Sequence, residues 1–299
     1  MVKMSAGKIT SDLYALGTPD FPVYLLKGKQ PVLFDAGMTF MGPRYLEDLK
    51  TSLGDQQTLA HLFLTHSHFD HSGAAPFLKR NIPRLKVAAS RLAGEIFKRP
   101  NAIKLIQSLS QGMEEKFRER IGNHDVTFQG LDLDRTFEDG EIVELENGTR
   151  IQVISTPGHT RDAVSYYIPH LKALVAGEAV GAVDQESAIR PVFLSSYEDY
   201  LDSLEKLRSL EVEILLFGHL YFVTENAQEM IVRAIESTRA FAQRIEQELD
   251  AAGGDQEVVV QKIFHEDRRE RNLIGMEDRP MLLNLTAQVK AIAGRKNQG

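Results

Sequence analysis

Three histidines and an aspartate fall within six consecutive positions of the segment Thr65-His66-Ser67-His68-Phe69-Asp70-His71-Ser72-Gly73. The segment follows the apolar run His61 to Leu64, which predicts a strand, so these side chains belong to a loop between a strand and the next helix. The first two histidines point the same way in an extended chain, whereas Asp70 and His71 lie at the turn into the next element. Imidazoles and carboxylates gathered in this way are typical metal ligands, and their placement suits two adjacent ions better than one.

The elements that must position this segment alternate between strands and helices. Short apolar runs bounded by glycine, proline or charged residues predict strands at 23–26, 31–35, 61–65, 86–89, 141–145, 150–155, 164–168, 173–176 and 212–216. Apolar residues at helical spacing predict helices at 43–53, 196–210, 224–249, 255–265 and about 279–292, with a helical stretch from Ser90 to about Gly122. This alternation favours a layered α/β architecture.

On this motif the sequence resembles the metallo-beta-lactamase superfamily, whose later metal ligands follow successive strands. Each later position has a counterpart here: His159 in Pro157-Gly158-His159-Thr160, Glu178 in Ala176-Gly177-Glu178, and His219 in Phe217-Gly218-His219. The run Val32-Leu33-Phe34-Asp35-Ala36-Gly37 matches the family's early turn from a strand to a glycine. The resemblance spans about residues 10 to 222. It implies a four-layer αβ/βα sandwich, with a catalytic domain over 1–223, a helical insertion at about 90–122, and a C-terminal helical cap over 224–299.

The resemblance also implies the metal ligands and the reaction. It assigns the ligands to two divalent ions, with Glu178 between them: His66, His68 and His159 for the first, and Asp70, His71 and His219 for the second. Zinc or iron suits these ligands, and manganese is a further candidate. Two such ions hold a bridging hydroxide at neutral pH, which attacks the substrate, so Asp70 and His71 are the expected catalytic residues.

Glu178 departs from the family pattern, in which the bridging residue is an aspartate. The additional methylene group moves the carboxylate by about one carbon–carbon bond, so we expect Glu178 to bridge the two ions, to bind one, or to shift the metal preference. Asp162 is a weaker alternative ligand, and Asp35 is expected to support the metal loop through hydrogen bonds rather than to bind metal. The remaining histidines have no partner at ligand spacing and are expected to be structural or exposed: His61, His124, His170 and His265.

The superfamily hydrolyses several kinds of bond, so the helical segments guide the expectation about the substrate. Within the superfamily, the layout resembles the quinolone-signal response proteins of pseudomonads, acyl-CoA thioesterases with C-terminal helices over the metal site. The segment from Arg190 to Leu207 carries this likeness. We therefore expect hydrolysis of a thioester or an activated ester, with an acyl-CoA-like substrate whose apolar arm meets the helices. Arg190, Tyr197 and Tyr221 are candidates for substrate contact because they lie near the later ligands in sequence.

The composition excludes several other functions. The 299 residues contain no cysteine, which excludes disulfides, iron–sulfur clusters and cysteine nucleophiles. A net charge of −7 disfavours nucleic-acid binding. No run approaches the ~20 apolar residues of a membrane span, and the first residues lack the apolar region of a signal peptide. We therefore expect a cytoplasmic protein that binds neither nucleic acid nor membranes, and a homodimer through the C-terminal helices is a further expectation.

Three alternatives stay open. A lactonase or a phosphodiesterase of the same fold would use the same pair of ions. A regulatory protein would keep the metal site but act by binding a partner through the apolar C-terminal helices. A mononuclear iron dioxygenase would use His66, His68 or His71 together with His159 and a carboxylate, although the full set of ligands for a second ion argues against it.

Overall fold

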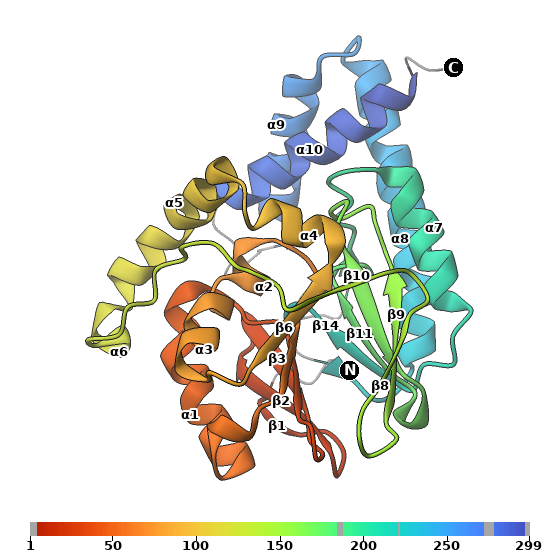
Figure 1. The fold of residues 1–299 in the computed structure, drawn as a ribbon. Coiled ribbons are helices and arrows are strands. Elements are labelled where there is room, and N and C mark those ends of the chain that lie inside the picture. Colours follow the sequence, from red (N-terminus) through yellow and green to blue (C-terminus); the bar gives the residue numbers. More distant parts are fainter. Residues whose placement is uncertain (1–4, 184–187, 221, 272–277, 297–299) are drawn as a thin grey trace. The chain divides into compact units, whose positions relative to one another are not determined.

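The computed structural model of the chain describes residues 5–183, 188–220, 222–271 and 278–296 (Figure 1). The chain divides into two compact units. Unit 1 comprises Met1–Ser155, Asp162–Gly177 and Val212–Ala227, and unit 2 comprises Thr156–Arg161, Glu178–Glu211 and Gln228–Gly299. The predicted division into 1–223 and 224–299 stays a prediction.

Two sheets form the body of unit 1. The first sheet runs β1 (Gly7–Lys8), β2 (Leu13–Thr18), β3 (Phe21–Leu26), β4 (Val32–Phe34), β5 (His61–Phe63), β6 (Lys86–Ser90) and β7 (Arg135–Phe137) in spatial order. The second runs β15 (Phe222–Val223), β14 (Ile214–Phe217), β11 (Ala173–Gly177), β10 (Val164–Ile168), β9 (Arg150–Ser155) and β8 (Ile142–Glu144). Neighbouring strands are parallel from β4 to β7 and between β11 and β14. The carboxyl ends of these parallel strands therefore deliver their loops to one edge of each sheet.

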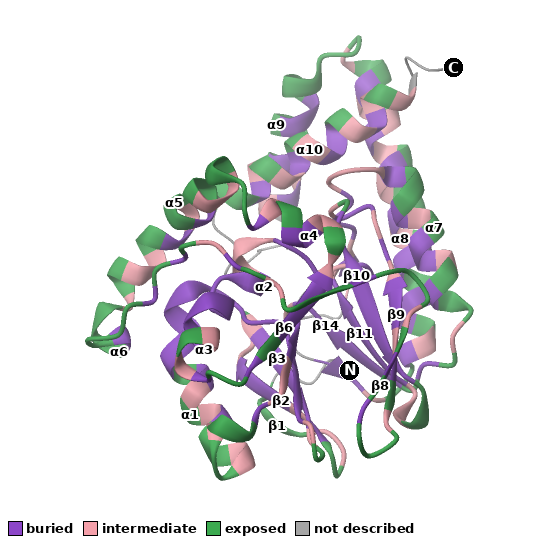
Figure 2. Ribbon diagram, in the orientation of Figure 1, coloured by how far each residue is buried: buried purple, intermediate pink, exposed green. Residues whose placement is uncertain are grey.

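Alternating side chains of the first sheet enter two different cores. One core lies between the two sheets and takes Leu13, Ala15 and Tyr24 from the first sheet and Val153 and Tyr166 from the second. The other core packs the opposite face of the first sheet against helices. These helices are α1 (Gly42–Leu53), α2 (Phe69–Ser72), α3 (Ala75–Asn81), α4 (Arg91–Ile96), α5 (Pro100–Lys116) and α6 (Arg118–Ile121). Figure 2 shows the consequence: the central strands are mostly buried, whereas the edge strands β1, β7 and β8 are largely exposed and the longer helices carry exposed residues along one side.

An aromatic cluster joins the two sheets beneath the ends of β4, β5 and β10. The ring centroid of Tyr166 lies 5.4 Å from that of Phe34, 5.6 Å from that of Phe63 and 6.0 Å from that of Phe137. The Tyr166 hydroxyl donates a hydrogen bond of 2.7 Å to the carbonyl oxygen of Leu64. Complete burial, together with the negative charge of Asp35, raises the pKa of Tyr166 well above its ordinary value. The phenol therefore remains a donor and holds the chain in place one residue before Thr65.

Unit 2 is mostly helical. It contains the short hairpin of β12 (Ala182–Val183) and β13 (Ile189–Arg190), and the helices α7 (Tyr197–Arg208), α8 (Ala227–Ala251), α9 (Gln256–Arg271) and α10 (Asp278–Lys296). Helix α7 begins at an N-terminal cap, where the Ser196 side chain accepts a hydrogen bond from the amide of Asp199. Arg295 of α10 ties two other helices together through ion pairs of 2.5 Å with Glu198 and 3.0 Å with Glu246. Among the described residues, no helix is both long enough and apolar enough to cross a membrane.

The predicted layered α/β class is confirmed, as are the helical stretch at about 90–122 and the helices after residue 224. The stretch at 90–122 is divided into α4, α5 and α6. Strand β2 was not predicted, because four of the six residues in its sequence Leu-Tyr-Ala-Leu-Gly-Thr are leucine, alanine or glycine, which favour strands less than the β-branched and aromatic residues do. The short strands β1, β7, β12, β13 and β15 were also missed, since two or three residues carry no periodic signal.

Candidate metal centre

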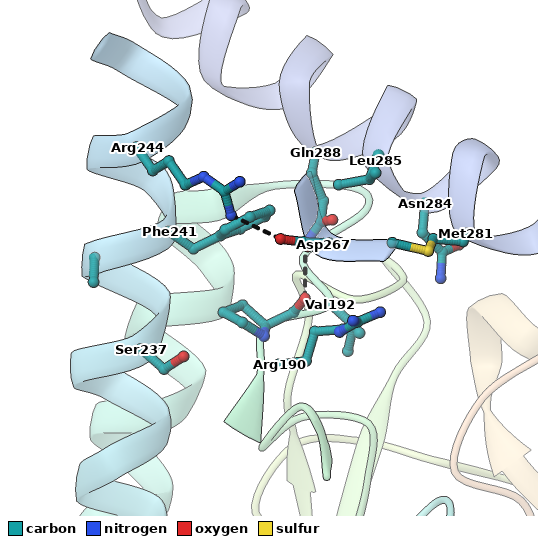
Figure 3. A pocket seen from close by; sticks show the side chains of 12 residues that line it. Arg190, Val192, Ser237, Phe241, Arg244, Asp267, Met281, Asn284, Leu285 and Gln288 are labelled. Atoms are coloured by element: carbon teal, nitrogen blue, oxygen red, sulfur yellow. Dashed lines mark hydrogen bonds and ion pairs between the residues drawn. The ribbon is translucent and has the colours of Figure 1, made fainter. Parts of the chain in front are cut away.

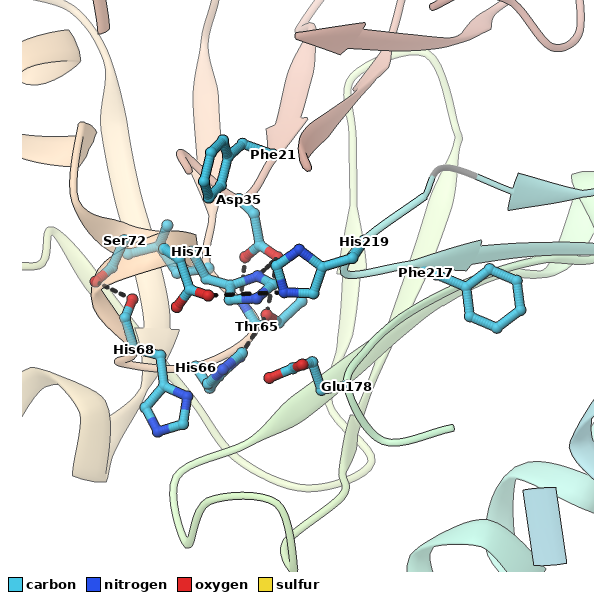
Figure 4. A network of polar contacts seen from close by, with 12 residues as sticks. Phe21, Asp35, Thr65, His66, His68, His71, Ser72, Glu178, Phe217 and His219 are labelled. Atoms are coloured by element: carbon cyan, nitrogen blue, oxygen red, sulfur yellow. Dashed lines mark hydrogen bonds and ion pairs between the residues drawn. The ribbon is translucent and has the colours of Figure 1, made fainter. Parts of the chain in front are cut away.

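Asp35 organises the motif segment in unit 1. It is buried, directly follows β4, and accepts hydrogen bonds from the Thr65 amide at 2.7 Å, the Thr65 hydroxyl at 2.9 Å and His71 Nδ1 at 3.0 Å (Figure 4). Its own amide donates to the carbonyl of Phe63 at the end of β5. The backbone φ of Asp35 is +62°, a left-handed conformation that aspartate adopts more readily than most residues other than glycine. These hydrogen bonds show how Asp35 can support the metal loop, which is the role predicted for it.

Thr65 in turn orients the ring of His66. The Thr65 hydroxyl proton is directed to Asp35, so its oxygen is left to accept from His66 Nδ1, which lies 3.0 Å away. His66 is buried, and its ring centroid lies 4.7 Å from that of His68 and 4.3 Å from that of His71. With the proton on Nδ1, the lone pair of His66 is on Nε2, which is the form that binds a metal.

Asp70, His71 and His219 form a group of ligand type that lies entirely within unit 1. One ligand atom from each of the three lies within 4.8 Å of the others. His71 Nδ1 faces a carboxylate and His219 Nδ1 lies 2.6 Å from the carbonyl oxygen of Asp20, so both rings carry their proton on Nδ1 and their lone pair on Nε2. His219 Nε2 lies 3.6 Å from Asp70 Oδ2.

The second carboxylate oxygen of Asp70 indicates most directly what this group can bind. Asp70 Oδ1 is buried and accepts no hydrogen bond from any described residue. A buried acceptor without a donor is costly in a folded protein, so such an atom calls for a bound partner. Two imidazole lone pairs and a carboxylate are the donor set of a divalent transition metal, and the group therefore fits a metal ion.

His159 and Glu178 form a close pair in unit 2. His159 Nε2 lies 2.5 Å from Glu178 Oε2, and His159 Nδ1 lies 2.7 Å from the carbonyl oxygen of Val192. The backbone carbonyl again fixes the proton on Nδ1 and the lone pair on Nε2. The Tyr200 hydroxyl donates to the backbone carbonyl of Glu178 at 3.0 Å. Complete burial and the carboxylate of Glu178 raise the pKa of Tyr200, so this phenol stays protonated and keeps its role as a donor.

The loop that carries His159 is held by its own backbone. Gly158 has a φ of +126°, and its carbonyl accepts hydrogen bonds from the amides of Leu194, Ser195 and Ser196. A Cβ atom at Gly158 would collide with the backbone of Tyr200. Only glycine therefore allows this loop to approach the start of α7 so closely.

The three residues predicted to contact substrate differ in what the structure describes of them. Tyr197 is buried at the start of α7, where its ring packs edge-on against Phe193 and beneath the guanidinium of Arg295 at 4.5 Å. Arg190 ends β13 and lines a pocket in unit 2. Tyr221 lies outside the described residues. A substrate role for these three residues stays a prediction.

Two supporting groups were not assigned their roles from the sequence. Asp162, considered there as an alternative ligand, accepts a hydrogen bond of 2.7 Å from the Ser67 amide through Oδ2. The carbonyls of Asp20 and Val192 orient two of the imidazoles. The four histidines predicted to be structural or exposed lie outside the groups of ligand type found among the described residues, and three of them are exposed: His124, His170 and His265.

Comparison with known proteins bears on the family of the chain. The sequence model of the metallo-beta-lactamase superfamily matches residues 22–219. The chain is 28% identical over 200 residues to the "Probable metallo-hydrolase YflN" of Bacillus subtilis. This match covers 63% of this chain and 74% of that protein. It is also 26% identical over 232 residues to the atrochrysone carboxyl ACP thioesterase of Aspergillus fumigatus. That match covers 76% of this chain but only 55% of the thioesterase, so this chain spans about half of that relative's length.

Solved structures show the same fold. A metallo-beta-lactamase family protein from Thermus thermophilus superposes with a TM-score of 0.67 at 21% sequence identity. The superposition covers 97% of this chain and 95% of the other. The likeness therefore extends over the C-terminal helices as well as the sheets, and it bears on the fold alone.

Proposed function

The chain belongs to the metallo-beta-lactamase superfamily, and from this premise we propose that it is a metal-dependent hydrolase that cleaves a thioester or a similarly activated ester. The observation that carries the proposal is the group of Asp70, His71 and His219, whose ligand atoms lie within 4.8 Å of one another in unit 1. Both imidazoles are fixed in the tautomer that leaves Nε2 as a ligand, and Asp70 Oδ1 is buried without a donor among the described residues.

We assign the second ion of the family pattern to this group. The first ion would be held by His66 and His68, which neighbour each other in unit 1, and by His159 of unit 2, with Glu178 at the position where the family has its bridging aspartate. Zinc, iron and manganese all suit this donor set. When bound, two such ions lower the pKa of a metal-bound water to about 7, and they stabilise negative charge on the oxygen of the attacked carbonyl.

The side chains of this chain have separate tasks in the reaction. Asp35 and Thr65 hold the imidazoles of His71 and His66 in one orientation, so no energy is needed to reorganise them during turnover. Asp70 supplies a carboxylate ligand to this group, and its oxygen that does not bind the ion can accept a hydrogen bond from the attacking water. His71 is buried against Asp35, which places a carboxylate behind the ring and strengthens its donation of electron density.

The preference for a thioester rests on two supports. One is the similarity to a fungal thioesterase, and the other is the apolar helical material at 90–122 and after residue 224. A net charge of −7 disfavours a nucleic-acid phosphodiesterase. The experiment must therefore also be able to detect hydrolysis of lactones and phosphodiesters.

The test is a substrate panel read out with a matched pair of variants. Purified protein is assayed with acyl-CoA thioesters, a homoserine lactone and bis-nitrophenyl phosphate, and kcat/KM is compared among them. We expect the thioesters to be cleaved fastest. His219→Asn should lower kcat/KM at least about a hundredfold, because it removes a ligand. His170→Asn, at an exposed turn, should leave it within about twofold. A faster lactone or phosphodiester reaction, or equal effects of the two variants, would overturn the proposal.

A further inference from the structure

The segment of residues 189–196 in unit 2 begins with strand β13 and ends at the cap of α7. Its middle is buried and consists of Pro191, Val192 and Phe193. The segment makes hydrogen bonds both to the C-terminal helices and to the loop that carries His159. It is therefore a direct link, within unit 2, between those helices and a metal-ligand candidate.

The loop of His159 is held by this segment at two consecutive residues. The carbonyl of Gly158 accepts hydrogen bonds from three backbone amides of residues 194–196. His159 itself donates from Nδ1 to the carbonyl oxygen of Val192 at 2.7 Å. The direction of the Val192 carbonyl therefore decides how the imidazole is turned, and with it the direction in which Nε2 offers its lone pair.

The C-terminal helices hold the start of the same segment through two hydrogen bonds. The Ser237 hydroxyl of α8 donates to the carbonyl of Ile189 at 2.7 Å. Gln288 of α10 donates from Nε2 to the carbonyl of Pro191 at 2.8 Å (Figure 3). Gln288 is only 3% exposed, so its amide is committed to this carbonyl and not to bulk water.

The path from Gln288 to His159 is short. The Pro191 carbonyl belongs to the planar peptide unit that joins Pro191 to Val192. Only the φ and ψ angles of Val192 separate that unit from the carbonyl that accepts from His159. A hydrogen bond that fixes the first carbonyl therefore limits the directions open to the second.

We propose that Gln288 is a positioning residue for the metal centre, because it fixes the peptide unit before Val192 and so keeps His159 Nε2 turned toward an ion. Helix α10 then contributes to the metal centre, although it carries none of the ligand candidates. This inference deepens the proposed function and rests on it, since it takes His159 to be a metal ligand. Gln288 acts through His159 and has no chemical task in the reaction.

The first measurement uses the metal-free protein, so it needs neither hydrolysis nor a bound ion. The Nδ1 proton of His159 is observed by NMR with isotope-labelled histidine and is assigned with His159→Asn. We expect slow exchange with water in the wild type, because the ring is buried and Nδ1 is hydrogen-bonded. Exchange should be about three- to tenfold faster in Gln288→Met and Gln288→Asn, which is the effect of losing about one hydrogen bond.

The variants are matched in what they remove. Gln288→Met keeps the length of the side chain without its donor, and Gln288→Asn keeps the amide but retracts it by one methylene group. Gln288 borders a pocket of about 180 Å³, so neither change overpacks its surroundings. Thr238→Val is the control: Thr238 is buried on α8, and its hydroxyl binds the carbonyl of Ala234 in the same helix. This control loses a buried hydrogen bond that does not involve residues 189–196, and thermal unfolding checks that every variant is folded.

The second measurement separates a positioning role from a general loss of stability. Metal affinity is measured by chelator competition for each variant. Gln288→Met should weaken the ion assigned to His159 about three- to tenfold, and it should leave the ion of the Asp70 group within about twofold. A merely structural role would weaken both ions equally or neither. Thr238→Val should bind both ions as the wild type does.

The outcomes separate this proposal from the proposed function. It is overturned if the His159 Nδ1 proton exchanges at the wild-type rate in both Gln288 variants, or if Thr238→Val accelerates exchange as much. An equal weakening of both ions would also overturn it. Faster exchange confined to the Gln288 variants supports the positioning of His159 by Gln288. If the wild type then binds no metal, that result contradicts the proposed function instead.

Discussion

The two units hold their metal-ligand candidates in different ways. In unit 1, side chains orient side chains. Asp35 accepts hydrogen bonds from His71 and Thr65, and Thr65 accepts one from His66. In unit 2, the backbone gives the orientation: His159 donates to the carbonyl of Val192, and Tyr200 binds the carbonyl of Glu178. The comparison predicts that unit 1 is sensitive to the chemistry of single side chains, whereas unit 2 is sensitive to the path of the chain.

The difference follows from what each unit offers at the site. The parallel strands β4 and β5 end side by side, so Asp35 and Thr65 emerge at one edge and reach each other. The loop of His159 is instead held by the backbone carbonyl of Val192 and depends on Gly158 to pack against α7. His219 of unit 1 is an intermediate case, because its Nδ1 is held by the backbone carbonyl of Asp20.

The largest effect should come from the path of the chain in unit 2. Gly158→Ala places a Cβ against the Tyr200 backbone at a φ of +126°, and we expect a loss of about 2–5 kcal/mol in the free energy of unfolding. Gly148→Ala is the matched control: its φ is +79°, but a Cβ there meets nothing within 4 Å, so about 1 kcal/mol is expected. Urea unfolding measures both. Equal losses would show that the loop is not held by close packing.

The next effect concerns the chemistry of one side chain in unit 1. Asp35→Asn keeps the shape and tolerates the left-handed φ, but it turns one acceptor oxygen into a donor amide that faces either Thr65 or His71. We expect metal affinity to fall about 10- to 100-fold, and stability by about 1.5–3 kcal/mol. Chelator competition measures the affinity. An unchanged affinity would remove Asp35 from the account of how His71 is oriented.

A smaller effect is expected for the corresponding side chain in unit 2. Tyr200→Phe removes a hydrogen bond to a backbone carbonyl, so stability should fall by about 1 kcal/mol while metal affinity changes less than about twofold. The raised pKa of Tyr200 keeps the phenol protonated, so the stability difference should be constant from about pH 6 to about pH 9. A fall in metal affinity as large as that of Asp35→Asn would break the comparison between the units.

The smallest effect separates stability from metal binding within unit 1. Burial acts to raise the pKa of Asp134, but hydrogen bonds from Lys79 and Val87 outweigh it, so this pKa lies below its ordinary value. The carboxylate therefore stabilises the fold above about pH 4, and this contribution is lost as the pH falls through the lowered pKa. Asp134→Asn should cost about 1 kcal/mol at about pH 7 and leave metal affinity unchanged. The stability difference should narrow below about pH 4; a difference that grows in acid would contradict this assignment.

The sequence predicted the ligand candidates because their signals are local. His66 to His71 form a dense motif, and His159, Glu178 and His219 each follow a recognisable apolar strand. The groups that orient the imidazoles were harder to predict. Asp35 was recognisable because it belongs to a motif. The carbonyls of Asp20 and Val192, in contrast, are backbone groups that any residue would supply. They lie 199 and 33 residues away from His219 and His159, respectively. Partners of this kind are set by the fold rather than by residue type, so sequence alone does not reveal them.

Metal content per chain tests the central claim most directly. Untagged protein, purified without chelator, is measured by elemental analysis beside His71→Ala and the exposed control His170→Asn. We predict two equivalents of zinc, iron or manganese for the wild type and for His170→Asn, and a clear loss for His71→Ala. One equivalent or none in the wild type, or a full complement in His71→Ala, would contradict a pair of ions held by the motif of unit 1 and its partners.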